Sequence, residues 1–112
     1  MVSSAYVPER GDLIWLNFNL RTGHEQSGQR PAIVLSPGKY NYKTGLLLAC
    51  PITSKVKGYP FEVAVRAEKI DGVVLSDQVR SLDWKSRRAN LIEKASEETL
   101  ATVQEKLLVL LQ

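Results

Sequence analysis

Residues 46–53 read LLLACPIT and contain the longest apolar run of the chain. A short apolar run bounded by turn-forming residues is typical of a β-strand, and this one is apolar enough to be buried on both faces. Pro51 cannot donate a hydrogen bond to a neighbouring strand, so it predicts an edge position or a bulge. The run is far too short to span a membrane. It therefore predicts the buried strand of a β-rich domain.

Shorter apolar segments lie on both sides of this run, separated by Gly, Pro and Asn. In residues 13–18, the apolar side chains of Ile14, Leu16 and Phe18 point one way, and residues 15 and 17 point the other way, as expected of a strand with one buried face. Further strands are expected at residues 31–35, 61–65, 73–79 and 90–93. Residues 19–29, 37–45 and 54–60 are expected to form loops or turns, and Asp71-Gly72 is expected to form a turn.

The C-terminal segment has helical rather than strand periodicity. Ser96 is a suitable N-cap, and the two acids after it favour the positive end of a helix. The apolar positions then recur at helical spacing, which predicts a helix packed on the core through Leu100, Val103, Leu107 and Leu110, with Leu108 and Leu111 widening the stripe. The predicted fold is mainly β: a small curved antiparallel sheet or barrel closed by a C-terminal helix.

Length and composition limit the possible classes of protein. A chain of 112 residues with 44% hydrophobic and 24% charged residues is expected to form one globular domain, residues 1–112. A single cysteine excludes an intrachain disulfide and a multi-cysteine zinc site, and a single histidine further weakens any metal site. The first residues lack a signal-peptide pattern. We therefore expect a cytoplasmic protein that needs no metal or other cofactor and has no membrane segment.

Basic residues are concentrated in the middle of the chain. Residues 19–60 contain six Lys and Arg residues against one acid, Glu25. Such a patch favours a polyanionic partner, either a nucleic acid or an acidic peptide. The alternative is the solvated face of a slightly basic protein.

Polar residues gather where three apolar segments begin or end. HEQ at 24–26 leads to Arg30, PITS at 51–54 leads to two lysines, and SDQVR occupies 76–80. Residues at strand ends are well placed to form a site on a rigid scaffold. No Gly-rich phosphate loop or Ser/Cys–His nucleophile arrangement is recognisable in the sequence.

An ordered set of motifs gives the sequence a family resemblance. The motifs are RGDLIW at 10–15, GHEQ at 23–26, RPAIVLS at 30–36, PITS at 51–54, KGYPFEV at 57–63 and DQVRSLD at 77–83. In this order and spacing the chain resembles the MazF/PemK family of toxin endoribonucleases of bacterial toxin–antitoxin pairs, and most of all its MazF branch. The resemblance runs from about residue 6 to the C-terminus.

The resemblance implies a fold, a reaction and two partners. The expected fold is an SH3-like barrel of the CcdB/PemK type, assembled as a homodimer. The expected activity is metal-independent cleavage of single-stranded RNA, in particular mRNA, at short sequences, which inhibits translation and growth. The 2′-hydroxyl would attack its neighbouring phosphate and leave 2′,3′-cyclic phosphate and 5′-hydroxyl ends. The expected partner protein is an antitoxin whose flexible acidic tail lies in the RNA groove.

The resemblance also assigns catalytic residues. Arg30 occupies the position of the catalytic arginine, and a guanidinium can hold two phosphate oxygens of the transition state. Thr53 matches the catalytic threonine, whose hydroxyl can both donate and accept a hydrogen bond. Glu25 is a candidate general base or an acceptor for a base amino group, and its alternative role is that of a solvated loop acid.

RNA-binding residues are expected around these three. His24 and Asp77 match a pair used in the PemK branch, but Leu75 stands where that branch has an arginine, so Arg30 and Thr53 are the favoured pair. The expected RNA-binding residues are His24, Gln26, Gln29, Ser54, Lys55, Lys57, Asp77, Gln78 and Arg80, with Arg87 and Arg88 as further phosphate contacts.

Two other functions remain open from the sequence. One is a non-enzymatic toxin of the same fold, such as a CcdB-like gyrase poison, but those end in Trp-Gly-Ile and this chain ends in LLQ. The other is an RNA-binding barrel without turnover.

Overall fold

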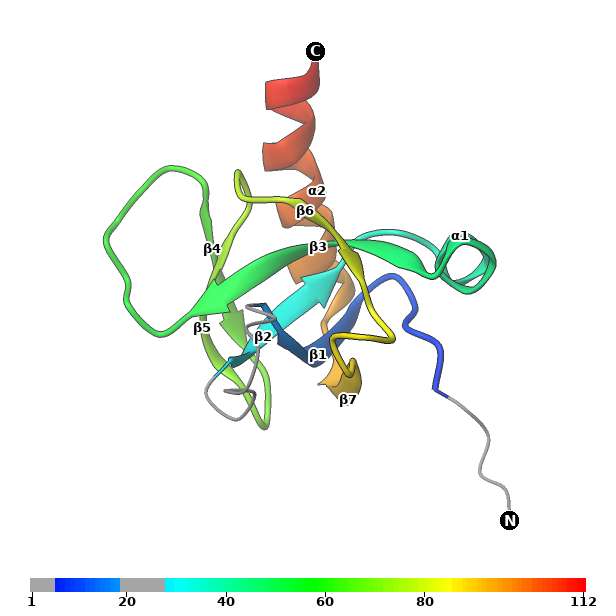
Figure 1. Ribbon diagram of the computed structural model, residues 1–112. Helices are drawn as coiled ribbons and strands as arrows, with labels where there is room; N and C mark the ends of the chain where they lie inside the picture. The colour runs from blue at the N-terminus through cyan, green and yellow to red at the C-terminus, as the bar shows by residue number, and fades with distance from the viewer. Residues whose placement is uncertain (1–5, 19–27) are drawn as a thin grey trace.

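The computed structural model describes residues 6–18 and 28–112, and a curved antiparallel sheet of half-barrel shape organises them (Figure 1). The sheet runs β4-β5-β3-β2-β1-β7, and β6 pairs with β3 outside this order. The elements are β1 (Asp12–Asn17), β2 (Gln29–Val34), α1 (Gly38–Thr44), β3 (Leu46–Thr53), β4 (Glu62–Arg66), β5 (Asp71–Leu75), β6 (Arg80–Asp83), β7 (Asn90–Lys94) and α2 (Glu97–Leu111). The predicted class, mainly β with a C-terminal helix, is confirmed.

Strand β3 lies at the centre of the sheet and pairs with three other strands. One side pairs with β2, and the other side pairs first with β6, up to Ala49, and then with β5, from Ile52. Pro51 lies opposite Ala32 of β2, in the gap between the two partners on the other side. The predicted edge position is therefore wrong. The proline is tolerated because its missing N–H falls where β3 changes partners.

Each face of the sheet carries its own apolar cluster, because side chains alternate along a strand. Ile14, Leu16 and Phe18 lie in one cluster, as their spacing predicts, together with residues of β2, β3 and β6. Leu13 lies in the other cluster, which includes Val103 of α2. Helix α2 thus covers one face of the sheet. Strand β3 is buried on both faces only in its second half, since Leu46 and Leu48 are exposed.

Helix α2 begins where the sequence predicts. The backbone of Ser96 is extended, and its hydroxyl accepts a hydrogen bond from the Thr99 N–H at 3.1 Å. Leu100, Val103 and Leu107 contact the core. The last turn departs from the predicted core packing, because Leu108, Leu110 and Leu111 are 49%, 49% and 69% exposed. No helix within residues 6–18 and 28–112 is long and apolar enough to cross a membrane.

Three local expectations are wrong. Within residues 37–45, expected to form a turn, Gly38–Thr44 form α1, because the buried Asn41 side chain donates to the carbonyl oxygens of Pro8 and Ser36 and fixes a short helix that lacks an apolar stripe. Asp71 and Gly72 lie inside β5 rather than in a turn. The strand expected over residues 73–79 ends at Leu75 with a turn, and residues 80–83 form the separate strand β6.

Candidate active site

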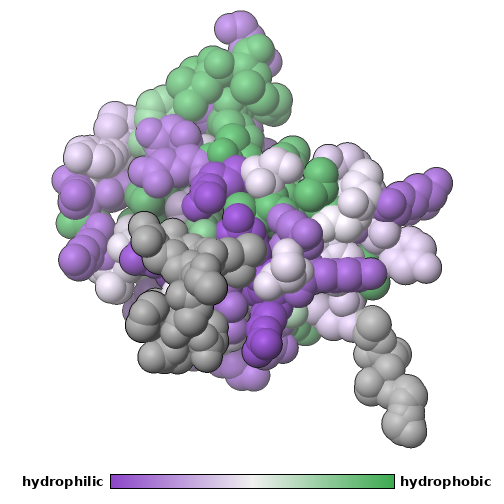
Figure 2. Space-filling view, viewed as in Figure 1, coloured by the Kyte–Doolittle hydropathy of each residue, from purple (hydrophilic) through white to green (hydrophobic). Residues whose placement is uncertain are grey.

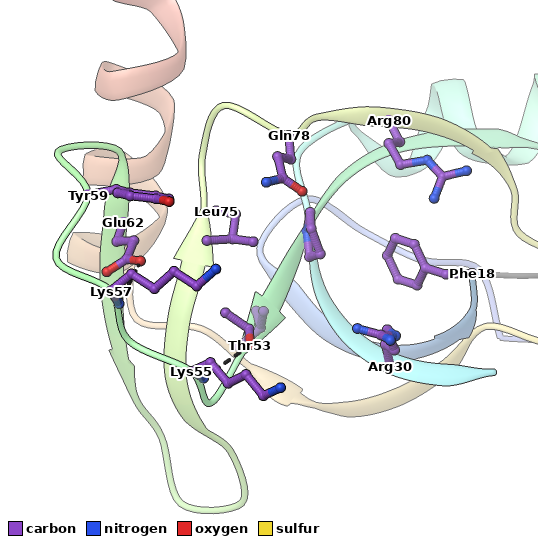
Figure 3. Close-up of a pocket in the computed structure, with 12 residues that line it drawn as sticks. Phe18, Arg30, Thr53, Lys55, Lys57, Tyr59, Glu62, Leu75, Gln78 and Arg80 are labelled. Atoms are coloured by element: carbon purple, nitrogen blue, oxygen red, sulfur yellow. Dashed lines mark hydrogen bonds between the residues drawn. The ribbon is translucent and has the colours of Figure 1, made fainter. Parts of the chain in front are cut away.

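A cavity of about 410 Å³ opens at the end of the sheet that is reached by β2, β3 and β5 (Figure 3). Arg30, Phe18 and Arg80 lie on one side of it, Lys57, Tyr59 and Glu62 lie on the other, and Thr53 lies between them. The described residues that line it are Phe18, Arg30, Pro51, Ile52, Thr53, Lys55, Lys57, Tyr59, Glu62, Leu75, Gln78 and Arg80.

Strand pairing brings the two expected catalytic residues to this cavity. Strands β2 and β3 run antiparallel to each other, and Ala32 of β2 pairs with Pro51 of β3. Arg30 and Thr53 each lie two residues further along, in the direction of the cavity, and therefore project from the same face of the sheet. Arg30 is exposed and Thr53 is half-buried. A phosphate group in the cavity can contact both side chains.

The Thr53 hydroxyl is held in place by the chain that follows it. Its oxygen accepts a hydrogen bond from the Lys55 N–H at 3.1 Å. That bond occupies one lone pair and leaves the hydroxyl proton free to donate to a ligand oxygen. Gly72 of β5 lies against the other side of the residue, since a Cβ atom at position 72 would be 2.5 Å from the Thr53 carbonyl oxygen. Only glycine allows β5 to approach this closely.

Positive charge dominates the cavity. Among the described residues, four cations line it, against the one carboxylate of Glu62: Arg30, Lys55, Lys57 and Arg80. The Arg80 guanidinium lies 5.4 Å from the centroid of the Phe18 ring, and the Lys57 ammonium lies 6.0 Å from that of Tyr59. Such a cavity suits a nucleic-acid strand, whose phosphates would contact the cations and whose bases would contact the aromatic rings.

The expected RNA-binding residues divide into three groups. Lys55, Lys57, Gln78 and Arg80 line the cavity together with Arg30 and Thr53. Ser54 lines an adjoining depression that also includes Arg30, Thr53 and Asp71. Gln29 and Asp77 are exposed outside the lining, and His24, Glu25 and Gln26 lie outside the described residues.

Two further residues, Arg87 and Cys50, are held within the fold. Arg87, expected to contact phosphate, instead donates to the carbonyl oxygens of Asn17 and Phe18 at 3.0 and 2.6 Å, so it fixes the end of β1. Burial, and secondarily the charge of Asp77, raises the pKa of the Cys50 thiol to about 12, which keeps it neutral in the core.

The cavity also holds residues that the sequence did not assign to the site, and two of them, Phe18 and Glu62, are informative. Phe18 continues the apolar alternation of β1, so its pattern is that of a core residue, although one face of its ring reaches the cavity. Glu62 is an acid after a basic loop, and two signals pointed to it: its position beside residues 54–60 and its place in the KGYPFEV motif at 57–63. In the described residues, no three or more His, Cys, Asp and Glu side chains are arranged to hold a metal ion.

Comparisons with known proteins identify the family. Residues 9–111 match the family described as PemK-like, MazF-like toxin of type II toxin-antitoxin system. Endoribonuclease toxin MazF of Escherichia coli (strain K12) is 48% identical over 108 residues, which cover 96% of this chain and 97% of that protein. Endoribonuclease PemK of Escherichia coli is 30% identical over 108 residues, covering 92% of this chain and 81% of that protein.

A solved structure agrees with the sequence matches. The crystal structure of MazE-MazF (Form-II) from Deinococcus radiodurans contains a chain that is 53% identical to this one, with a TM-score of 0.85. The match covers 96% of this chain and 97% of that chain. The chain therefore belongs to the PemK-like, MazF-like family of toxins of type II toxin–antitoxin systems.

Proposed function

We propose that the protein is the toxin of a type II toxin–antitoxin pair and acts as a sequence-specific endoribonuclease on single-stranded RNA. The observation that carries the proposal is the position of Arg30 and Thr53 at neighbouring strand ends, two residues beyond the Ala32–Pro51 pair, in a cavity that Lys55, Lys57 and Arg80 also line. The names of the MazF and PemK relatives, both endoribonucleases, support the same activity. Inhibition of translation in the cytoplasm follows if mRNA is the substrate.

The reaction assigned to this site needs no metal ion. The 2′-oxygen of one nucleotide bonds to the neighbouring phosphorus, and the bond from phosphorus to the 5′-oxygen breaks. A proton leaves the 2′-hydroxyl and a proton joins the 5′-oxygen, so the products are a 2′,3′-cyclic phosphate and a 5′-hydroxyl. Arg30 stabilises the negative charge on the phosphate oxygens in the transition state, and the Thr53 hydroxyl donates to one of them.

The remaining residues bind RNA or move the proton. Lys55, Lys57 and Arg80 are assigned to phosphates, and Gln78 is assigned to base edges. Glu25 is proposed as the general base. We also assign His24, Gln26, Gln29, Ser54 and Asp77 to RNA binding, because their side chains can donate or accept hydrogen bonds to bases and riboses.

Two protein partners belong to the proposal. An antitoxin with an acidic tail would bind the four cations of the cavity and compete with RNA; the MazE-MazF complex of the relative supports this pairing. A second copy of the chain would cover the apolar surface that gathers over α2 (Figure 2), where Leu110 and Leu111 are exposed. Sedimentation analysis is expected to give a dimer, and a monomer at micromolar concentration would contradict the homodimer.

Cleavage of a long mixed-sequence RNA in excess EDTA tests the activity. Wild-type protein is expected to cut at discrete sites and leave cyclic-phosphate ends, whereas Arg30→Ala is expected to lose at least 100-fold in rate. Arg66→Ala is the matched control, because it removes an exposed arginine on β4 outside the cavity. RNA binding without cutting by folded, antitoxin-free protein would refute the nuclease and leave the barrel without turnover.

A further inference from the structure

One wall of the cavity is a loop whose side chains alternate between two surfaces. Lys55, Lys57 and Tyr59 line the cavity, whereas Ser54 and Val56 line a separate depression against β4 and β5. Residues 54–60 are named here the basic arm, and the side chains of its odd-numbered residues 55, 57 and 59 line the cavity. Gly58 ends this stretch with a φ of +83°.

The basic arm is fastened at both ends by side-chain oxygens of cavity residues. At its start, the Lys55 N–H donates to the Thr53 hydroxyl. At its far end, the Glu62 carboxylate accepts the Lys57 N–H at 3.1 Å on one oxygen and the Gly58 N–H at 3.0 Å on the other. In addition, the Glu62 N–H donates to the Tyr59 carbonyl oxygen at 3.1 Å, which closes the turn into β4.

Glu62 has a fixed position from which to hold the arm. It is the first residue of β4, is half-buried, and pairs with Leu75 of β5. Its side chain lies beside Lys57 and Tyr59 at the cavity (Figure 3). Hydrogen bonds from backbone N–H groups to an ionised carboxylate are the strong kind, so two of them can hold a loop that has no strand partner.

A carboxylate in this place works against RNA binding. It lines a cavity with four cations, where it repels the phosphates that the cations attract. A residue that merely tuned affinity for RNA would be neutral or basic here. Both carboxylate oxygens of Glu62 accept hydrogen bonds from backbone N–H groups of the arm. This arrangement indicates that Glu62 fixes the geometry of the arm rather than binding RNA.

We propose that Glu62 is a positioning residue that fixes the basic arm, and that the arm in this position determines which bases are accepted beside the cut bond. The inference rests on the proposed nuclease function. Lys57 carries one of the two amides held by Glu62 and Tyr59 directly follows the other, so the placement of both side chains against a bound nucleotide follows from the two hydrogen bonds. An arm without these hydrogen bonds would still supply positive charge. The Tyr59 ring and the Lys57 ammonium would no longer be fixed, however, and could not exclude a wrong base.

The test compares base discrimination with affinity. The readout is the ratio of kcat/KM for the preferred RNA sequence to that for single-base variants next to the cut bond. Glu62→Ala is expected to lower this ratio at least 10-fold, while RNA affinity stays equal or increases because a negative charge is removed. Glu62→Gln retains one acceptor oxygen and is expected to fall between Glu62→Ala and the wild type.

A charge control separates geometry from electrostatics. Glu68→Gln removes one negative charge from an exposed residue in the turn after β4, outside the cavity, and is expected to leave the ratio unchanged. An unchanged ratio in folded Glu62→Ala would overturn the proposal. So would an equal loss of kcat on every sequence, because that pattern indicates a role in the chemistry or in stability.

Amide hydrogen exchange tests the arm without RNA. In the wild type, the Lys57 and Gly58 amides are expected to exchange more slowly than that of Val56, whose N–H has no acceptor within the described residues. Equal exchange at the three amides overturns the proposal even if the Glu62 variants fail to fold. If the arm is protected but no RNA is cut, the proposed function fails while the fastening of the arm stands.

Discussion

The close approach of Gly72 to Thr53 gives a sharp prediction for the site. In Gly72→Ala, the new Cβ atom would lie 2.5 Å from the Thr53 carbonyl oxygen and 3.1 Å from its carbonyl carbon. The first distance is about 0.9 Å below the 3.4 Å at which ordinary contact begins. Neither atom can rotate away, because Thr53 is held in register with Val73 and belongs to the paired backbone of β3. The strands must separate locally.

Both stability and cleavage are therefore expected to fall in Gly72→Ala. Overpacking of this kind costs about 2–3 kcal/mol of unfolding free energy. The cleavage rate is expected to drop roughly 100-fold, since a displacement near 1 Å of a catalytic group has that effect. Urea unfolding followed by circular dichroism gives the first quantity, and single-turnover cleavage of RNA in EDTA gives the second.

Gly45→Ala is the matched control. Gly45 also has a positive φ, +74°, but a Cβ atom there would have no neighbour within 4 Å. It is expected to lose only about 1 kcal/mol from backbone strain and to cleave RNA at the wild-type rate. If Gly72→Ala behaves like Gly45→Ala in both assays, then the contact with β5 does not hold Thr53 in place.

Three further predictions concern single side chains. Thr53→Val is expected to cut RNA about 100-fold more slowly with little change in melting temperature, and unchanged cutting would remove the hydroxyl from the mechanism. Ser96→Ala is expected to lose about 1 kcal/mol in thermal unfolding, because the Thr99 N–H loses its acceptor. Cys50 has a pKa raised from 9.0 to about 12 in the folded protein, so an unfolded chain releases this proton first. Stability is thus expected to decline between about pH 9 and 12, and less steeply in Cys50→Ala; equal slopes would contradict this.

The sequence predicted the elements whose signals are local. The alternation of Ile14, Leu16 and Phe18 predicted the buried face of β1, and Ser96 with the apolar stripe after it predicted the start of α2. Arg30 and Thr53 were found through motifs, and the strand register then explains why they lie together.

Other elements depend on contacts between distant residues. Helix α1 is fixed by Asn41, which bonds to Pro8, and by the Trp84 indole N–H, which donates to the Asn41 carbonyl oxygen. No pattern within residues 37–45 indicates these partners. The exposed last turn of α2 has the same apolar spacing as its buried part, so periodicity alone could not distinguish the two.

The change of partners along β3 has a mechanical consequence. Within the described residues, the β4–β5 hairpin, which carries Glu62 and Leu75, pairs with the rest of the sheet at two positions of β3, Ile52 and Thr53. A movement of the hairpin relative to β3 therefore acts directly on the backbone of Thr53. The width of the cavity and the position of the Thr53 hydroxyl are therefore coupled, so a ligand that displaces the hairpin also moves the hydroxyl.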